Sequence, residues 1–215
     1  MEAKKYLEDI TEIKNMMSRS SRFISLSGLS GIMAGIYALI GAFIAKLLLD
    51  NHLQSIKNHQ DSAKAGLYEI IETSDLIFNL LLIASSVALL AIVTGFILTN
   101  RKAKKSGEDI WNASSRRLVL NFLIPLMAGG LFCLVLLQYG YVGLVASATL
   151  IFYGLACVNA SKYTLGDIRY LGIANIIIGL IATQFIGYGL YFWALGFGVF
   201  HIIYGTLMYF KHDKK

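Results

Sequence analysis

One histidine stands out in a long uncharged stretch near the end of the chain. Residues 170–210 contain no Asp, Glu, Lys or Arg, and they contain a single histidine, His201. An imidazole titrates near pH 6.5 and can act as an acid, a base or a metal ligand. Gly198 and Gly205 lie three and four residues from His201, which places all three on one helix face. We therefore expect the imidazole to meet a neighbouring helix.

Asn175 is the candidate partner of this histidine. Folding the chain about residue 189 brings Asn175 to the depth of His201, so we expect the two side chains to approach each other or to share a partner. A membrane-embedded ionisable group is a functional hypothesis by default, and here it suggests a pH-sensitive switch. The other interpretation is a neutral histidine hydrogen-bonded between helices, which contributes about 0.6 kcal/mol.

Three arginines form a second candidate site. Arg22, Arg116 and Arg117 follow pairs of serines, and each group directly precedes an apolar stretch. Serines are favourable helix N-caps, and the free N–H groups of a helix start attract anions. The arginines therefore indicate either a site for lipid-headgroup phosphates or positive charge that fixes the membrane topology.

Motifs for catalysis or metal binding are absent from the sequence. There is no HExxH, P-loop or GxSxG pattern, and Cys133 and Cys157 form no CxxC. His52 and His59 are seven residues apart, and two histidines alone seldom hold a metal. None of the 13 acidic residues lies clearly within an apolar stretch, whereas proton-driven transporters usually keep a membrane carboxylate there. We expect no cofactor, no metal and no enzymatic activity.

The elements that carry these residues are predicted to be membrane-spanning helices. The 215 residues are 56% hydrophobic and only 15% charged. A helix needs about 20 apolar residues to cross the hydrocarbon core, and its backbone must be hydrogen-bonded internally. The sequence predicts an all-α polytopic membrane protein with six spans, at about residues 23–48, 75–99, 118–138, 141–160, 170–188 and 191–210.

The distribution of positive charge predicts the orientation of the spans. Of the 19 Lys and Arg residues, 16 lie in the segments that the topology places on the side of the two termini, and two lie in the 50–74 loop on the other side. Cytoplasmic segments carry such an excess, so both termini are expected to be cytoplasmic. Residues 1–22 are expected to form an amphipathic helix and residues 211–215 a short tail. The net charge of +6 reflects topology and gives no reason to expect nucleic acid binding.

A repeat indicates how the spans are organised. SSRFISLSGLSGIMAG (20–35) and SSRRLVLNFLIPLMAG (114–129) share Ser-Ser-Arg, two leucines and Met-Ala-Gly at equal spacing. A fainter third copy repeats Gly-Leu and Tyr-Gly pairs at 179–189. We therefore predict three tandem helical hairpins with rough pseudo-threefold symmetry about the membrane normal, the first with a long polar outer loop.

Small residues predict how the helices pack. Gly28, Gly31 and Gly35 begin a stripe of small residues along the first span, and a similar stripe on the second span ends at Gly95. Such stripes let helix backbones approach closely in a membrane. The simpler interpretation is that spans one and two pack on each other, and the alternative is a homo-oligomer interface. The one proline, Pro125, cannot bond to the carbonyl of Asn121 and should kink the third span.

The repeats resemble the short-repeat membrane proteins typified by the HdeD acid-resistance protein. The stretch GLYFWALGFGVFHIIYGTLMYF (189–210) is most similar to that repeat. The resemblance implies a bacterial inner-membrane location and an association with stress, and the family supplies no catalytic residues.

These observations lead to two functional hypotheses. The first is a non-enzymatic inner-membrane protein connected with envelope stress or lipids, whose partners are membrane lipids or further copies of the chain. The second is a small transporter or channel with a path near His201 or along the bundle axis. A close-packed apolar axis favours the first hypothesis, and a polar path favours the second.

Overall fold

A computed structural model of the chain describes Tyr6, Phe23 and residues 26–59, 65–107 and 109–214. The described part is helical and contains no strand. Its elements, in chain order, are α2 (Gly28–His59), α3 (Ala65–Lys105), α4 (Ala113–Gln138), the 3-10 turn η1 (Val142–Leu144), α5 (Val145–Ala160), α6 (Ile168–Ala182), α7 (Gly189–Trp193), the π-helical segment η2 (Ala194–Val199), α8 (Phe200–Met208) and the π-helical segment η3 (Tyr209–Asp213). The predicted N-terminal amphipathic helix and Arg22 lie outside the described residues.

Apolar helices dominate this architecture. Among the described residues, five helical stretches are long and apolar enough to cross a membrane: Gly28–Lys57, Thr73–Lys105, Ala113–Gln138, Val142–Ala160 and Gly189–Asp213. The last of these joins α7, η2, α8 and η3 and extends into the predicted tail. The remaining predicted span corresponds to α6, which has 15 residues and a length of about 22 Å, less than the ~30 Å hydrocarbon core. The structure therefore has the all-helical, apolar character of a membrane protein.

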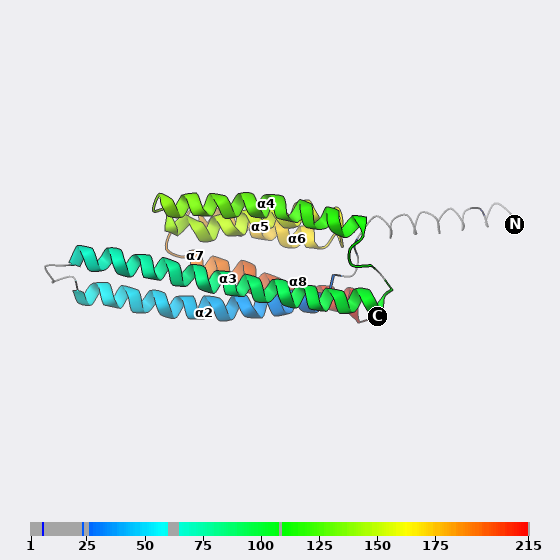
Figure 1. Cartoon of the computed structure of the whole chain (residues 1–215), viewed down its shortest axis with the longest axis horizontal. Helices are drawn as coiled ribbons and strands as arrows, with labels where there is room; N and C mark the ends of the chain where they lie inside the picture. Colours follow the sequence, from blue (N-terminus) through cyan, green and yellow to red (C-terminus); the bar gives the residue numbers. More distant parts are fainter. Residues whose placement is uncertain (1–5, 7–22, 24–25, 60–64, 108, 215) are drawn as a thin grey trace.

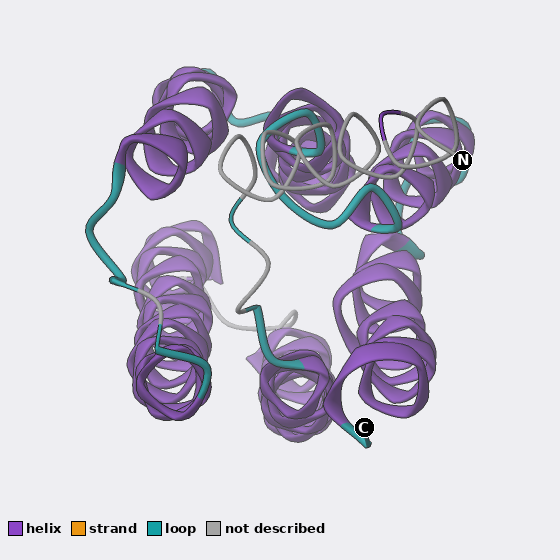
Figure 2. Ribbon diagram, turned by 90° about the vertical axis from the view of Figure 1, so that its right-hand side faces the viewer, coloured by secondary structure: helices purple, strands orange, loops and turns teal. Residues whose placement is uncertain are grey.

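The helices form two layers of three. One layer contains α4, α5 and α6, with α5 in the middle, and the other contains α3, α2 and the rod formed by α7 and α8, with α2 in the middle (Figure 2). The first two predicted hairpins each pack within one layer. The two helices of the third predicted hairpin lie in different layers, because α6 packs mainly on α5 while α8 packs mainly on α2. This unequal packing gives no support to the predicted pseudo-threefold symmetry.

The first hairpin is longer than predicted. Most of the expected polar loop at 50–74 is helical, since α2 continues to His59 and α3 begins at Ala65. These helical ends project beyond the other helices at one end of the bundle (Figure 1). Polar residues mark where the chain leaves the membrane, but they do not stop a helix that contains no proline.

The glycines of the first span face the last span. A Cβ added at Gly205 would lie 2.5 Å from the backbone nitrogen of Ile32, and one added at Gly28 would lie 2.6 Å from the carbonyl oxygen of Gly205. Gly35 likewise abuts the carbonyl of Gly198. Spans one and two do pack on each other as predicted, but the glycines of this stripe do not form the contact between them. These glycines allow α2 and α8 to touch backbone to backbone.

The contact between α2 and α3 uses other residues. Gly41 on α2 faces Val87 of α3, and the hydroxyls of Tyr37 and Thr94 are 3.2 Å apart. A Cβ at Gly95 would meet nothing within 4 Å, and Ala84 and Ala88 of the same stripe are exposed. The prediction that Gly95 packs against a helix is therefore wrong for the described part of the chain.

One end of the bundle is tied together by the last turn of the chain. We call it the basic end, because it carries Lys102, Arg116, Lys162 and Lys211, and the charge pattern predicts it to be cytoplasmic. Asp213 accepts hydrogen bonds from the backbone N–H of Gly28 (2.8 Å) and from Nζ of Lys102 (2.5 Å). A carboxylate at a helix start satisfies a free N–H and complements the helix dipole. Asp213 thus caps α2 and fixes α3 beside it.

A second tie at the basic end connects the two layers. The backbone N–H of Phe23 donates to the carbonyl of Tyr163 at 2.8 Å, and the Thr164 hydroxyl donates to the carbonyl of Phe23 at 2.7 Å. Phe23 is 4% exposed and Thr164 is fully buried. The chain entering α2 is thereby fastened to the loop between α5 and α6.

The helix α4 begins earlier than predicted and passes through its proline. Asn112 is the N-cap, and its side-chain oxygen accepts from the backbone N–H of Ser115 at 2.8 Å. The helix is continuous across Pro125. The carbonyl of Asn121, which Pro125 cannot bond, accepts instead from Nδ2 of Asn159 on α5 at 2.8 Å. A side chain from the neighbouring helix thus replaces the missing backbone hydrogen bond.

Candidate functional site

His201 lies inside the bundle with both ring nitrogens hydrogen-bonded. Nδ1 is 2.9 Å from the carbonyl oxygen of Gly196, and Nε2 is 2.7 Å from the hydroxyl of Tyr153. A carbonyl can only accept, so Nδ1 carries a proton, and in the neutral ring Nε2 accepts from the tyrosine. The side chain is 6% exposed. His201 therefore links the last span to α5, in the opposite layer.

Aromatic rings surround this hydrogen-bonded pair. The Tyr153 ring lies 4.9 Å from Phe197, 5.2 Å from His201 and 5.8 Å from Phe122, measured between ring centroids. Trp193 packs on Phe197 at 5.0 Å. Rings at such separations attract each other beyond the effect of burial alone. The cluster joins α4, α5 and the last span, and its four aromatic residues are partly buried.

Asn175 approaches the histidine site from α6. Its Nδ2 donates to the carbonyl of Leu171 at 2.9 Å, while its Oδ1 is fully buried and has no hydrogen-bond partner among the described residues. A Cβ added at Gly196 would lie 2.5 Å from this oxygen. Both side chains thus contact Gly196: Asn175 lies against its α-carbon, and His201 bonds to its carbonyl oxygen. No hydrogen bond is found between Asn175 and His201 themselves.

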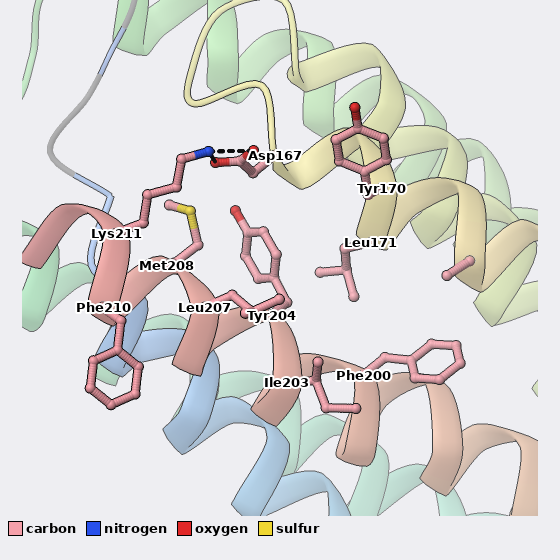
Figure 3. Close-up of a pocket in the computed structure, with 11 residues that line it drawn as sticks. Asp167, Tyr170, Leu171, Phe200, Ile203, Tyr204, Leu207, Met208, Phe210 and Lys211 are labelled. Carbon is pink, nitrogen blue, oxygen red and sulfur yellow. Dashed lines mark hydrogen bonds and ion pairs between the residues drawn. The ribbon is translucent and has the colours of Figure 1, made fainter.

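A groove opens on the side of the bundle between α6 and the last span. Its volume is about 670 Å³, and it is lined by Asp167, Tyr170, Leu171, Ala174, Phe200, Ile203, Tyr204, Leu207, Met208, Phe210 and Lys211. Most of these side chains are aliphatic or aromatic (Figure 3). Small-molecule sites typically have about 300–1,000 Å³ and apolar walls with a few polar groups. The groove has the size and composition of a binding site for an apolar molecule.

The polar groups gather at one end of the groove. Nζ of Lys211 contacts both carboxylate oxygens of Asp167, at 3.1 and 2.9 Å, and Nε2 of His212 lies 3.4 Å from one of them. The hydrogen bond from Lys211 is the main cause that lowers the pKa of Asp167 below its ordinary value, so the carboxylate is ionised at neutral pH. The Tyr204 hydroxyl points from the groove towards this ion pair (Figure 3). This polar end of the groove lies at the basic end of the bundle.

The predicted arginine site is on a different part of the surface. Arg116 and Arg117 are exposed on the first turn of α4, and the guanidinium of Arg116 stacks over Trp111 at 5.8 Å. Neither lines the groove. Ser114 and Ser115 are buried and follow the actual cap, Asn112, so they do not cap the helix as expected.

Two features of the site were not predicted from the sequence. The first is the hydrogen bond between Tyr153 and His201. The one feature of the sequence that could have indicated it is a tyrosine in the middle of an uncharged stretch, since amphipathic rings are more common at the membrane boundary. The second is the groove, because its aliphatic residues have the composition of a surface that faces lipid. Asp167 and Lys211, which flank the two spans, are the residues that could have indicated a polar end of the groove.

Comparison with known proteins gives no match: the chain matches no family model, no curated protein and no solved structure.

Proposed function

We propose that this chain is a non-enzymatic integral protein of a bacterial inner membrane that holds a membrane lipid in the groove between α6 and the last span. The observation that carries this proposal is the composition of the groove. Apolar walls lead to a charged pair, Asp167 and Lys211, at the basic end. A lipid has the same arrangement, since its acyl chains are apolar and its headgroup is charged.

The length of the groove supports the proposal. Its lining on the last span extends from Phe200 to Lys211, and eleven steps at 1.5 Å per residue give about 17 Å. The hydrocarbon core is about 30 Å thick, so this is close to the depth of one leaflet. A lipid of the leaflet at the basic end can therefore lie along the groove with its headgroup beside Lys211.

The packing inside the bundle bears on the alternative of a transporter or channel. Tyr153 and Phe197 pack on the ring of His201, Phe122 and Trp193 pack on these two rings, and both nitrogens of the histidine are occupied by protein partners. An interior filled in this way favours the lipid-associated hypothesis over a polar path beside His201. The link to envelope stress rests on the resemblance to HdeD-type proteins alone.

The test is native mass spectrometry of the protein released from its membrane in mild detergent. The wild-type chain is expected to retain a lipid. Filling the groove by Ala174→Trp, or by Ile203→Trp as a second variant, should reduce the retained fraction about tenfold or more, because each side chain lines the groove. Leu180→Trp is the matched control, since Leu180 lies on the same helix as Ala174, is exposed and is not part of the lining.

Two outcomes would contradict the proposal. One is a wild-type protein that carries no lipid after gentle release. The other is equal loss of lipid in Leu180→Trp and in the two groove variants, which would show that any added bulk weakens general lipid contact.

A further inference from the structure

We infer that the groove selects an anionic glycerophospholipid, with Lys211 as the contact for the headgroup phosphate, the Tyr204 hydroxyl as a second donor and Asp167 as a competing carboxylate. This inference rests on the proposed function and names the class of lipid. Three observations carry it: the charge around the mouth of the groove, the geometry of Lys211, and the orientation of Tyr204.

Positive charge predominates around the mouth. Arg169 and Lys214 lie near the ends of α6 and the last span, the two elements that form the groove, and both are exposed. Neither makes an ion pair with another described residue, whereas Asp167 is paired with Lys211 and Asp213 with Lys102. Basic residues at a membrane surface attract anionic lipids, by about 1 kcal/mol each. The local field therefore favours a negative headgroup.

Lys211 is placed to meet a phosphate first. Its side chain is 62% exposed, compared with 32% for that of Asp167. An ammonium group has three donors, and the two contacts to Asp167 leave the third available to an incoming oxygen. A headgroup that arrives at the mouth of the groove can thus bind Lys211 while the ion pair stays intact.

Asp167 is poorly placed to bind a cationic headgroup. Its carboxylate already accepts from Lys211 and lies beside His212, and both partners come from the same segment, η3. An ethanolamine ammonium would meet a carboxylate that is less exposed than Lys211 and whose charge Lys211 already neutralises. The same ammonium would be repelled by Lys211, and this difference distinguishes anionic from zwitterionic lipids.

Tyr204 supplies a second polar contact. Its hydroxyl is directed towards the Asp167–Lys211 pair (Figure 3), and it makes no hydrogen bond to another described residue. A phenolic O–H can donate to a phosphate oxygen. Tyr170 also lines the groove, but its hydroxyl points away from the ion pair (Figure 3), so it serves as a natural comparison.

The test is a competition between two lipids. Protein is equilibrated with equal amounts of phosphatidylglycerol and phosphatidylethanolamine that carry identical acyl chains, and native mass spectrometry gives the ratio of the two retained lipids. The wild type should favour phosphatidylglycerol. Lys211→Gln should lower the ratio about two- to fivefold, the range of one partly exposed ionic contact. Asp167→Asn should raise the ratio, because it removes the competing carboxylate.

Matched controls separate the groove from general surface charge. Lys162→Gln removes the same charge at the same end of the bundle, but Lys162 does not line the groove, so the ratio should stay near the wild-type value. Tyr204→Phe should lower the retention of both lipids, because both carry the phosphate that this hydroxyl would contact, and Tyr170→Phe should lower it less.

The outcomes distinguish this inference from the proposed function. A wild-type protein that retains neither lipid overturns the proposed function. Retention of lipid with a ratio that Lys211→Gln and Asp167→Asn leave unchanged overturns only the inference. An equal fall in the ratio for Lys162→Gln and Lys211→Gln also overturns it, since general charge would then account for the selectivity.

Discussion

Asn159 shows how a single side chain can make a proline tolerable in a membrane helix. Pro125 leaves the carbonyl of Asn121 without its usual donor, and Asn159 donates to that carbonyl from the next helix. In lipid there is no water to take this role. The hydrogen bond therefore serves both the continuity of α4 and its attachment to α5.

The first prediction concerns this pair. Asn159→Leu should lower the free energy of unfolding by about 0.6 to 1.7 kcal/mol, the range measured for hydrogen bonds between membrane helices. The measurement is denaturant unfolding in detergent micelles. Pro125→Ala restores a backbone donor for Asn121, so in the Pro125→Ala background the loss caused by Asn159→Leu should become smaller. An equal loss in both backgrounds would show that the hydrogen bond does not act through the proline.

At the residue scale, the sequence identified the important polar positions better than their partners. His201 and Asn175 were expected at similar depth, and both lie against Gly196. The hydrogen-bond partner of His201 is Tyr153, which comes from another hairpin. Helical spacing defines a face of one helix, but it does not determine which helix lies opposite. A partner from a distant part of the chain therefore needs the three-dimensional structure.

At the scale of elements, the backbone-to-backbone crossing of α2 and α8 can be tested by a single substitution. Gly205→Ala should separate these helices and lower the free energy of unfolding by about 1–3 kcal/mol, as overpacking does in protein interiors. The cause is the backbone of Ile32, which lies 2.5 Å from the new Cβ position and cannot rotate away. Unfolding in detergent measures the effect.

Gly95→Ala is the matched control for this prediction. Gly95 is also a helical glycine in an apolar stretch, but its Cβ position is open. The substitution should be neutral or slightly stabilising, because alanine is the better helix former by about 1 kcal/mol. Equal destabilisation by both substitutions would contradict the assignment of Gly205 to a helix contact.

The elements also show which parts of the fold could be predicted. Uncharged stretches located the helices well, since lipid excludes charge and requires a fully hydrogen-bonded backbone. The extended ends of α2 and α3 were missed, because the helices continue past the membrane boundary that the charges mark. The groove was missed for a different reason: its aliphatic lining has the same composition as an outer surface in contact with lipid.

At the scale of the whole molecule, the predicted orientation can be tested directly. In a cysteine-free background, Gln54→Cys should react with a membrane-impermeant thiol reagent in intact cells, and Ser106→Cys should react only after the membrane is permeabilised. Both positions are exposed. Gln54 lies near the end of α2, where α2 and α3 are connected, and Ser106 directly follows the other end of α3. The reverse pattern would contradict cytoplasmic termini, and it would place the mouth of the groove in the outer leaflet.

The contact between the first and last spans has a consequence for biosynthesis. Gly28 and Gly205 are 177 residues apart, and at 5–20 residues per second a ribosome needs about 9 to 35 s to make the chain between them. During that interval α2 is already made, while its glycine face lacks α8 and its first turn lacks Asp213. The bundle closes only after α8 has been made, so a ribosome stalled after α6 would leave a nascent chain whose first span has no native partner for this face.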